Sequence, residues 1–202
     1  MLGVVLLIAV LIPGIGTVVT GTAVSGRVRV GDRLRLSPSG LEVRVRGLHA
    51  QNQAAEEGLA GQRLALNLVG AEKQQVQRGH WLVHEALHAP TQRLAARLRL
   101  LPSEAKALAH WTPVHLHLGA EDVNARVALL EGSSLQPGGH ALVQFDLDRP
   151  IGALRGDRFI IRDQSAQRTL GGGQVVDPFA PPSRRHRSQL VEALKAMEAP
   201  TA

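Results

Sequence analysis

With 202 residues, 44% hydrophobic and 20% charged, the chain is long enough for one large or two small globular domains, and this composition excludes a disordered or collagen-like protein. The absence of Cys excludes disulfides, thiol nucleophiles and Cys-ligated zinc, and three Phe, two Trp and no Tyr argue against an aromatic platform for single-stranded nucleic acid. The formal net charge is +6, and 20 of the 23 basic residues are Arg, which favours a polyanionic partner because guanidinium groups bind phosphate in a bidentate manner.

The first 12 residues form an almost continuous run of Leu, Val and Ile, and no charged side chain occurs before Arg27. Such a run is typical of a signal peptide or membrane anchor, but no Lys or Arg precedes it, and Pro13 and Gly14 interrupt it. The β-branched segment TVVTGTAV at 17–24 predicts a buried strand instead. We therefore treat residues 1–12 as an apolar leader, leave both interpretations open, and begin the first domain at residue 13.

Short strands separated by Gly and Pro turns continue to residue 88. Alternation with a period of two occurs at 27–30, 33–36, 41–46 and 63–68, with apolar residues on one face and mostly charged residues on the other. This pattern predicts a half-buried antiparallel sheet. We also expect a polar loop over 49–57, a single helical turn over 71–76 and a strand at 81–83.

A second set of strands follows a boundary at 85–90, where the alternation is lost and a Pro occurs. The predicted strands are 93–100, 114–118, 123–130, 141–145, 158–162 and 174–176, and between them we expect a helix over 103–109. Two successive runs of short strands predict an all-β fold of two consecutive antiparallel β-barrels, at 13–88 and 89–178, because closure removes exposed strand edges.

Residues 179–202 contain most of a basic, Pro-rich linker (PFAPPSRRHR, 178–187), followed by a short C-terminal helix that Ser188 can cap. One face of this helix carries Leu190, Val191, Leu194 and Met197, and the sequence shows no obvious partner for that face. We therefore interpret the segment as the start of a truncated helical domain.

No catalytic motif is found, so we do not expect an enzyme. The segment from Gly16 to Thr22 has the glycine spacing of a phosphate-binding loop, but it lacks the required Lys and lies in a predicted strand. No G-x-S-x-G segment occurs, and single carboxylates such as Asp32 and Asp157 fit turns.

The histidines give only a weak metal signal. His80, His84 and His88 are spaced by four, but the segment between them is predicted as strand. A strand face shared by His115 and His117, with His110 nearby, is an arrangement that can bind zinc. Because no further ligand has a specific signal, we expect solvent-facing histidines and no metal, and a metal-dependent enzyme stays as an alternative.

Basic residues cluster in the second set of strands. Arg155, Arg158, Arg162 and Arg168 lie within 14 positions, and Arg126 lies on a separate strand. A solvated strand face and a nucleic-acid backbone surface both explain this pattern, so the pattern alone leaves the two open.

Three segments resemble the translational GTPases related to elongation factor Tu. GIGTVVTGTAVSGRVRVGD (14–32) resembles the start of their second domain, EGLAGQRLALNLVGAEKQQVQRGHWLV (57–83) its closing half, and RPIGALRGDRFIIRDQSAQRTLGGGQVVDP (149–178) the last strands of their third domain. Within this family, VRGLHAQNQ (45–53) and SAQRTL (165–170) are most similar to the bacterial selenocysteine-specific elongation factors.

The resemblance implies a cytoplasmic translation module that binds selenocysteyl-tRNA and works with the ribosome. It implies an aminoacyl pocket at Gln62, Arg63 and His49, in which an enclosed Arg63 faces the selenolate and refuses serine because its own charge would be left unpaired. It also implies contacts to the tRNA backbone, made by Arg126, Arg158, Arg162 and Arg168.

The chain also departs from the family pattern. The sequence has no counterpart of the family's GTPase domain, which holds GTP and Mg²⁺, or of its winged-helix domains for the mRNA hairpin. We therefore expect no cofactor and no hydrolysis here. Where the family carries an acidic and then a basic residue, this chain has Leu7 and Ile8, so half of the charged pocket is missing. The alternative function is an orphaned structural or interaction barrel, held at a membrane by residues 1–19.

Overall fold

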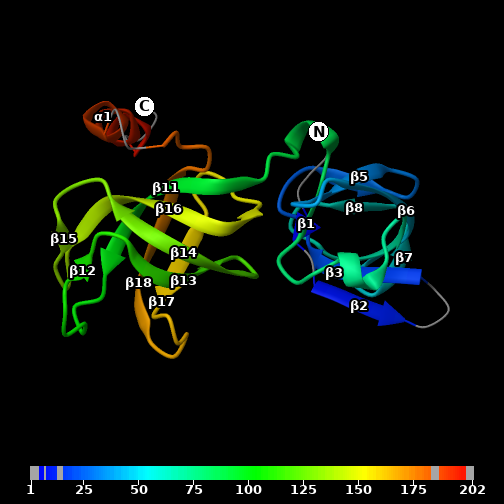
Figure 1. Cartoon of the computed structure of the whole chain (residues 1–202). Helices are drawn as coiled ribbons and strands as arrows, with labels where there is room; N and C mark the ends of the chain where they lie inside the picture. Colours follow the sequence, from blue (N-terminus) through cyan, green and yellow to red (C-terminus); the bar gives the residue numbers. More distant parts are fainter. Residues whose placement is uncertain (1–4, 7, 13–15, 183–186, 199–202) are drawn as a thin grey trace. The chain divides into compact units, whose positions relative to one another are not determined.

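The computed structural model describes residues 5–6, 8–12, 16–182 and 187–198, and it describes side chains from residue 16 onward. The chain divides into two compact units, Met1–Pro90 and Thr91–Ala202. Both are built from antiparallel strands, and one α-helix is found in the described residues of the second unit (Figure 1). The predicted all-β fold with a C-terminal helix is confirmed.

The first unit is a strongly curved sheet. Its elements are β1 Val5–Leu6, β2 Ile8–Ile12, β3 Gly16–Thr22, β4 Arg27–Arg29, β5 Arg33–Ser37, β6 Leu41–Ala50, β7 Gln53–Ala55, β8 Glu57–Leu59, β9 Arg63–Val69, β10 Trp81–Val83 and two 3₁₀ turns, η1 Lys73–Gln75 and η2 Glu85–Leu87. The strand order is β1-β10-β5-β6-β9-β3-β2, and β4 pairs separately with β8. Because β1 also lies against β3, the two ends of the sheet approach one another and almost close a barrel.

Alternation explains why these residues form this unit. Along β9, Leu64, Leu66 and Leu68 point inward and are at most 2% exposed, while the residues between them face outward. Burying each of these side chains contributes about 1.5–3 kcal/mol. Val19, Val43 and other aliphatic residues from β3, β5, β6 and β10 complete a core without any Phe or Tyr.

The apolar N-terminal run contributes strands to this sheet where it is described. Leu6 pairs with Trp81 in β10, and Ile8 to Ile12 pair with Thr20 to Gly16 in β3. The predicted strand after this run is confirmed as β3. None of the helices in the described part of the chain has the length and hydrophobicity needed to cross a bilayer.

The predicted loop over 49–57 is wrong for most of its length, because 49–50 belong to β6, 53–55 to β7 and Glu57 to β8. Gln51 and Asn52, both with positive φ, form a tight turn that lets Gln53–Ala55 fold back as β7 against β6. Two successive residues with positive φ are typical of a hairpin turn. The sequence signal was weak because Gln51 replaces the Asn or Asp, and Asn52 the Gly, that usually mark this turn.

The second unit contains a closed barrel. Its elements are β11 Thr91–Leu100, β12 Leu108–Ala109, β13 Thr112–Leu118, β14 Glu121–Leu129, β15 Ser134–Leu135, β16 His140–Ile151, β17 Arg158–Arg162, β18 Thr169–Asp177 and α1 Arg187–Glu198. The barrel order is β11-β16-β14-β13-β17-β18, and β18 returns to pair with β11. Phe145 and Phe159 meet edge to face in the core, with ring centroids 5.1 Å apart.

The helix expected over 103–109 does not form. Residues 103–107 form a turn, a bend and irregular backbone, and Leu108–Ala109 is strand β12, paired with β15. Leu108 is buried, but the other six residues supply no apolar stripe, and so short a helix is not stable without packing.

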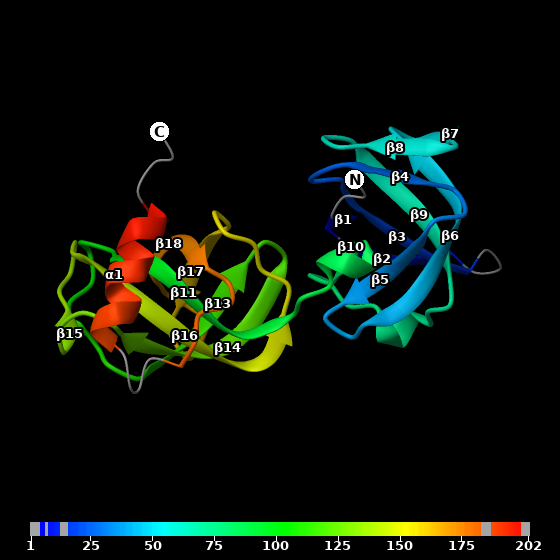
Figure 2. The same ribbon diagram turned by 90° about the horizontal axis from the view of Figure 1, so that it is seen from above.

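Helix α1 is not left without a partner, which corrects the expectation from sequence. Leu190 and Leu194 are buried against Ala95, Leu142 and Val176 of the second barrel. In both views the helix lies along the outside of this barrel (Figures 1 and 2). The missing partner is thus the outer face of β11, β16 and β18, a face that the strand alternation alone assigns to solvent.

Each unit contains one Trp in a different setting. Trp81, in β10, is 7% exposed. Trp111 precedes β13 in a turn with φ of 65°, is 38% exposed, and lies edge to face with His110 at a centroid distance of 5.5 Å.

Candidate functional site: three hollows and their arginines

His49 lies beside a hollow of about 380 Å³ on the outer face of the first unit. Strand β6 carries His49 opposite Ala65 of β9, and both line the hollow together with Arg46, Gly47 and Asn67. Most of the remaining lining is aliphatic. The hollow therefore suits a small group that is partly apolar and needs a few polar contacts.

Gln62 and Arg63, the other two predicted pocket residues, lie next to this hollow and do not line it. Arg63 shares the outward face of β9 with Ala65, two residues or about 7 Å along the strand. Its side chain is exposed and makes no ion pair within the described residues, so the first unit by itself does not enclose the guanidinium. The Gln62 side chain accepts a 2.7 Å hydrogen bond from the Leu59 backbone N–H, which ties it to the turn before β9.

The two positions that depart from the family pattern lie in the N-terminal run. Leu7 is outside the described residues. Ile8 belongs to β2, where its backbone pairs with Thr20 of β3.

Arg126 and Arg162 lie on opposite sides of β13 in the second barrel. Arg126 is exposed on β14 and lines a hollow of about 350 Å³ with His115, Asp148 and Gln164. Arg162 of β17 pairs across the sheet with His115 and donates a 3.1 Å hydrogen bond to the Gln167 carbonyl. The Arg162 Nε is buried and has no partner in the described residues. Two of the four predicted backbone-contacting arginines thus lie on the two strands that flank β13.

Arg168 lies on the loop that leads from β17 to β18, and carboxylates neutralise it. Its guanidinium is 3.3 Å from Glu104 and 3.9 Å from Asp163. Backbone N–H groups of Arg168 and Gln167 donate to Asp163, and the pKa of Asp163 is lowered mainly by the bond from Arg168. The Glu104 side chain is only 8% exposed whereas the Arg168 side chain is 59% exposed, so a phosphate approaches Arg168 at the exposed part of its guanidinium and does not displace Glu104.

Arg158 is separated from Arg162. The two lie at opposite ends of β17, about 13 Å apart along the strand. Arg158 lines a different hollow together with Arg97, Arg99 and Arg155. The sequence did not identify Arg97 and Arg99 as candidate site residues. The signal that could have found them is their alternation with apolar residues in the RLRL segment of β11.

The histidines do not form a metal site within the described residues. His115 and His117 stack on one strand face as expected, with their Nδ1 atoms 3.2 and 3.9 Å from Asp122. His80 accepts a hydrogen bond from Gln77 N–H, and His84 accepts one from Ala86 N–H. The three-histidine enzyme proposed as an alternative gains no support from this arrangement.

Each unit matches a known sequence family. Residues 16–83 match "Elongation factor Tu domain 2", and residues 95–182 match "Selenocysteine-specific elongation factor, beta-barrel domain". Both matches fall on barrel domains outside a GTPase domain. They favour the translation-factor hypothesis over the orphaned barrel.

Curated relatives align with most of the chain. It is 38% identical to a selenocysteine-specific elongation factor of Desulfomicrobium baculatum over 188 residues, which cover 93% of the chain and 30% of the relative. It is 42% identical to the selenocysteine-specific elongation factor of Escherichia coli K12 over 177 residues, covering 87% of the chain and 27% of that relative. The chain therefore spans about a third or less of these relatives.

Solved structures support the fold. The apo form of translation elongation factor SelB from Methanococcus maripaludis superposes with a TM-score of 0.72 at 24% identity, over 89% of the chain and 43% of that structure. A bacterial selenocysteine-specific elongation factor EF-Sec superposes with a TM-score of 0.78 at 21% identity, over 97% of the chain and 31% of that structure.

Proposed function

Because the chain belongs to the family of selenocysteine-specific elongation factors, we propose that it is a tRNA-binding module of a cytoplasmic translation factor that carries selenocysteyl-tRNA to the ribosome. The first unit takes the aminoacylated end, and the second unit contacts the tRNA backbone. The observation that supports this proposal most strongly is that the two barrel matches occur in this order along one chain.

The residues present do not fit a nucleotide site. The glycine-spaced segment from Gly16 to Thr22 is strand β3, paired on both sides, and it has no Lys to reach a phosphate. GTP and Mg²⁺ belong to the GTPase domain of the family, and we assign no catalysis to this chain.

In the first unit, Arg63 supplies the positive charge at the aminoacyl site and His49 lines the adjacent hollow. A selenol is ionised at neutral pH, whereas the serine hydroxyl is neutral, so a cation at this place favours the selenolate. Leu7 and Ile8 carry no charge, so Arg63 acts without the acidic and basic pair that the family pattern places there.

In the second unit, Arg126, Arg162 and Arg168 approach phosphates of the tRNA backbone. Such contacts fix position and do not read sequence. If each of the three neutralises one phosphate, the logarithm of the binding constant falls with the logarithm of salt concentration with a slope of about −2 to −3.

The test is a binding titration of the whole chain with selenocysteyl-tRNA and seryl-tRNA at several salt concentrations. We expect preference for the selenocysteyl form and a loss of that preference, by about tenfold, in Arg63→Ala. Arg44→Ala is the matched control, since Arg44 is exposed on β6 of the same unit and makes no ion pair within the described residues. Equal binding of both charged tRNAs by the parent chain would refute the selenocysteine pocket, and absence of tRNA binding would refute the proposed function.

A further inference from the structure

A hollow of about 480 Å³ on the outer face of β11, β17 and β18 has an unusual concentration of positive charge. We call it the arginine pocket, and its principal lining residues are Arg97, Arg99, Arg155, Arg158, Gly173 and Glu198. The last two residues of α1 form one wall. Four guanidinium groups and one carboxylate thus meet at one place.

Strand register explains how the arginines converge. Gln174 of β18 pairs with Arg97 on one side and with Arg158 on the other, so the two arginines emerge about 10 Å apart in one row across the sheet. In the next row, Arg99 pairs with Gly172 of β18, which has no side chain to fill the space beside it. The pocket is therefore a product of antiparallel pairing around the glycine run of β18.

Glycine at 171 and 173 is required by close backbone contact. A Cβ atom on Gly173 would overlap the Arg97 carbonyl oxygen, and one on Gly171 would overlap the Arg99 carbonyl oxygen. These glycines let β18 close the barrel against β11.

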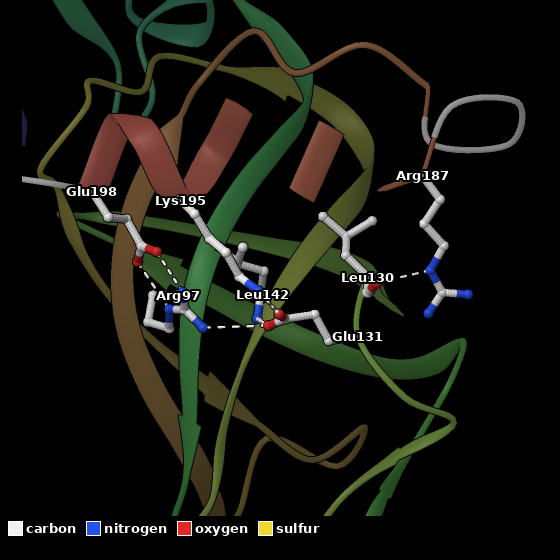
Figure 3. A network of polar contacts seen from close by, with 7 residues as sticks. All are labelled: Arg97, Leu130, Glu131, Leu142, Arg187, Lys195 and Glu198. Atoms are coloured by element: carbon white, nitrogen blue, oxygen red, sulfur yellow. Dashed lines mark hydrogen bonds and ion pairs between the residues drawn. The ribbon is translucent and has the colours of Figure 1, made fainter. Parts of the chain in front are cut away.

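Two of the four arginines already donate hydrogen bonds to oxygen atoms of α1. Arg97 Nε donates to Glu198 at 2.9 Å, and a second hydrogen bond joins the other atoms of the same pair. Arg155 donates to the Met197 carbonyl at the C-terminal end of the helix. Figure 3 shows Glu198 reaching from α1 to Arg97, which also approaches Glu131 at 3.4 Å.

The other two arginines are free to bind. The side chains of Arg99 and Arg158 are exposed and make no hydrogen bond or ion pair within residues 16–182 and 187–198. The bound carboxylate and carbonyl show that the pocket accommodates oxygen acceptors, and bidentate recognition by several guanidinium groups is typical of phosphate.

We propose that the arginine pocket is a binding site for phosphodiester groups of an RNA backbone, held by Arg99 and Arg158 and shared with Arg97. Glu198 is an internal competitor for Arg97, so its carboxylate lowers the affinity of the pocket for phosphate. The choice of RNA as the source of the phosphate rests on the proposed function, whereas the affinity of the pocket for inorganic phosphate does not.

The first experiment measures binding of inorganic phosphate to the whole chain by NMR titration. We expect the double variant Arg99→Gln/Arg158→Gln to bind at least about tenfold more weakly than the parent. Arg44→Gln/Arg78→Gln removes the same charge from exposed positions of the first unit that make no ion pair within the described residues, and we expect less than about a twofold change. Equal losses in both double variants, or no phosphate binding by the parent, would overturn the site.

A second pair of variants tests the competitor. Glu198→Gln is expected to raise phosphate affinity by about threefold or more, because it removes the carboxylate from Arg97. Glu192→Gln makes the same charge change on an exposed position of the same helix and is expected to have a much smaller effect. If the two variants behave alike, net charge and not the pocket explains the binding.

The source of the phosphate is settled by a short RNA duplex. If the backbone is the ligand, Arg99→Gln/Arg158→Gln weakens duplex binding and reduces the magnitude of the salt slope by about 2. If inorganic phosphate binding is lost but duplex binding is unchanged, the pocket takes free phosphate and the RNA assignment is wrong. Loss of discrimination between charged tRNAs in Arg63→Ala tests the proposed function separately, because Arg63 lies in the other unit.

Discussion

The hollow beside His49 and the arginine pocket are both formed by outward-facing residues of neighbouring antiparallel strands, yet their linings differ. The first contains Val18, Val30 and several other aliphatic residues with Arg46 and Glu56, whereas the second contains four arginines. The same pleated surface thus offers an amphipathic recess in one unit and a cationic one in the other. The comparison teaches that the residue types at alternate positions, and not the architecture, set the ligand chemistry.

The second difference is the wall that α1 provides. No helix lines the hollow beside His49 within the described residues, whereas the end of α1 forms one wall of the arginine pocket and partly neutralises its charge. Three predictions test this comparison, from the largest expected effect to the smallest.

Leu194→Ala is expected to release α1 from the second barrel and so to remove one wall of the arginine pocket. Leu194 is 1% exposed and packs against Leu142 and Val176, so its truncation costs about 2–5 kcal/mol of helix docking. Hydrogen exchange of the α1 amides measures the loss. Glu192→Ala on the exposed face is the control, and unchanged protection of α1 in Leu194→Ala would contradict the packing described here.

A glycine in each hollow gives a matched comparison. Gly173→Ala forces β18 away from β11, because the new methyl group overlaps the Arg97 carbonyl, and it is expected to destabilise the second unit by about 1–3 kcal/mol. Gly47→Ala places a methyl group 4.0 Å from the nearest atom, Asn67 Cβ, and is expected to change stability by less than about 0.5 kcal/mol.

Urea unfolding of the whole chain distinguishes the two glycine variants. A large loss of stability in Gly47→Ala, or none in Gly173→Ala, would show that the described packing at these strands is wrong.

Glu131 makes the docking of α1 dependent on pH. The hydrogen bond from Lys195, 2.7 Å away, is the main cause that lowers the pKa of Glu131 below its ordinary value of 4.5. Because the folded-state pKa is the lower one, this stabilisation is complete above about pH 4.5 and is lost as the pH falls through the folded-state value. The carboxylate is partly exposed, so we expect an effect below about 1 kcal/mol.

Hydrogen exchange of α1 between pH 7 and pH 3 measures this effect, with Glu131→Gln as the variant that removes it. A parent and variant with the same pH dependence would exclude Glu131 as the titrating group.

Much of the strand pattern was predictable, because alternation in β5, β6, β9 and β17 follows directly from one buried and one solvated face. The start of β18 was missed since its glycines carry no hydrophobic signal, although their backbone closes the barrel. The docking of α1 was missed because its partner is the outer side of a sheet, which local alternation assigns to solvent.

The candidate site residues likewise include some that the sequence identified and some that it did not. Residues on the resemblance segments, such as Arg63 and Arg162, were identified from their places in those segments. Arg97 and Arg99 were not, since alternating Arg in a strand has the same pattern whether it faces water or a ligand. Only the register with β18 brings them to Arg158.

The two tryptophans give each unit its own optical reporter. Trp81 is enclosed in the first unit and Trp111 is partly exposed in the second, and the sequence has no Tyr to add background emission. A Trp81→Phe chain therefore reports fluorescence from the second unit alone, and a Trp111→Phe chain from the first alone. Ligand titrations and denaturation curves can thus be followed in either unit without attaching a dye.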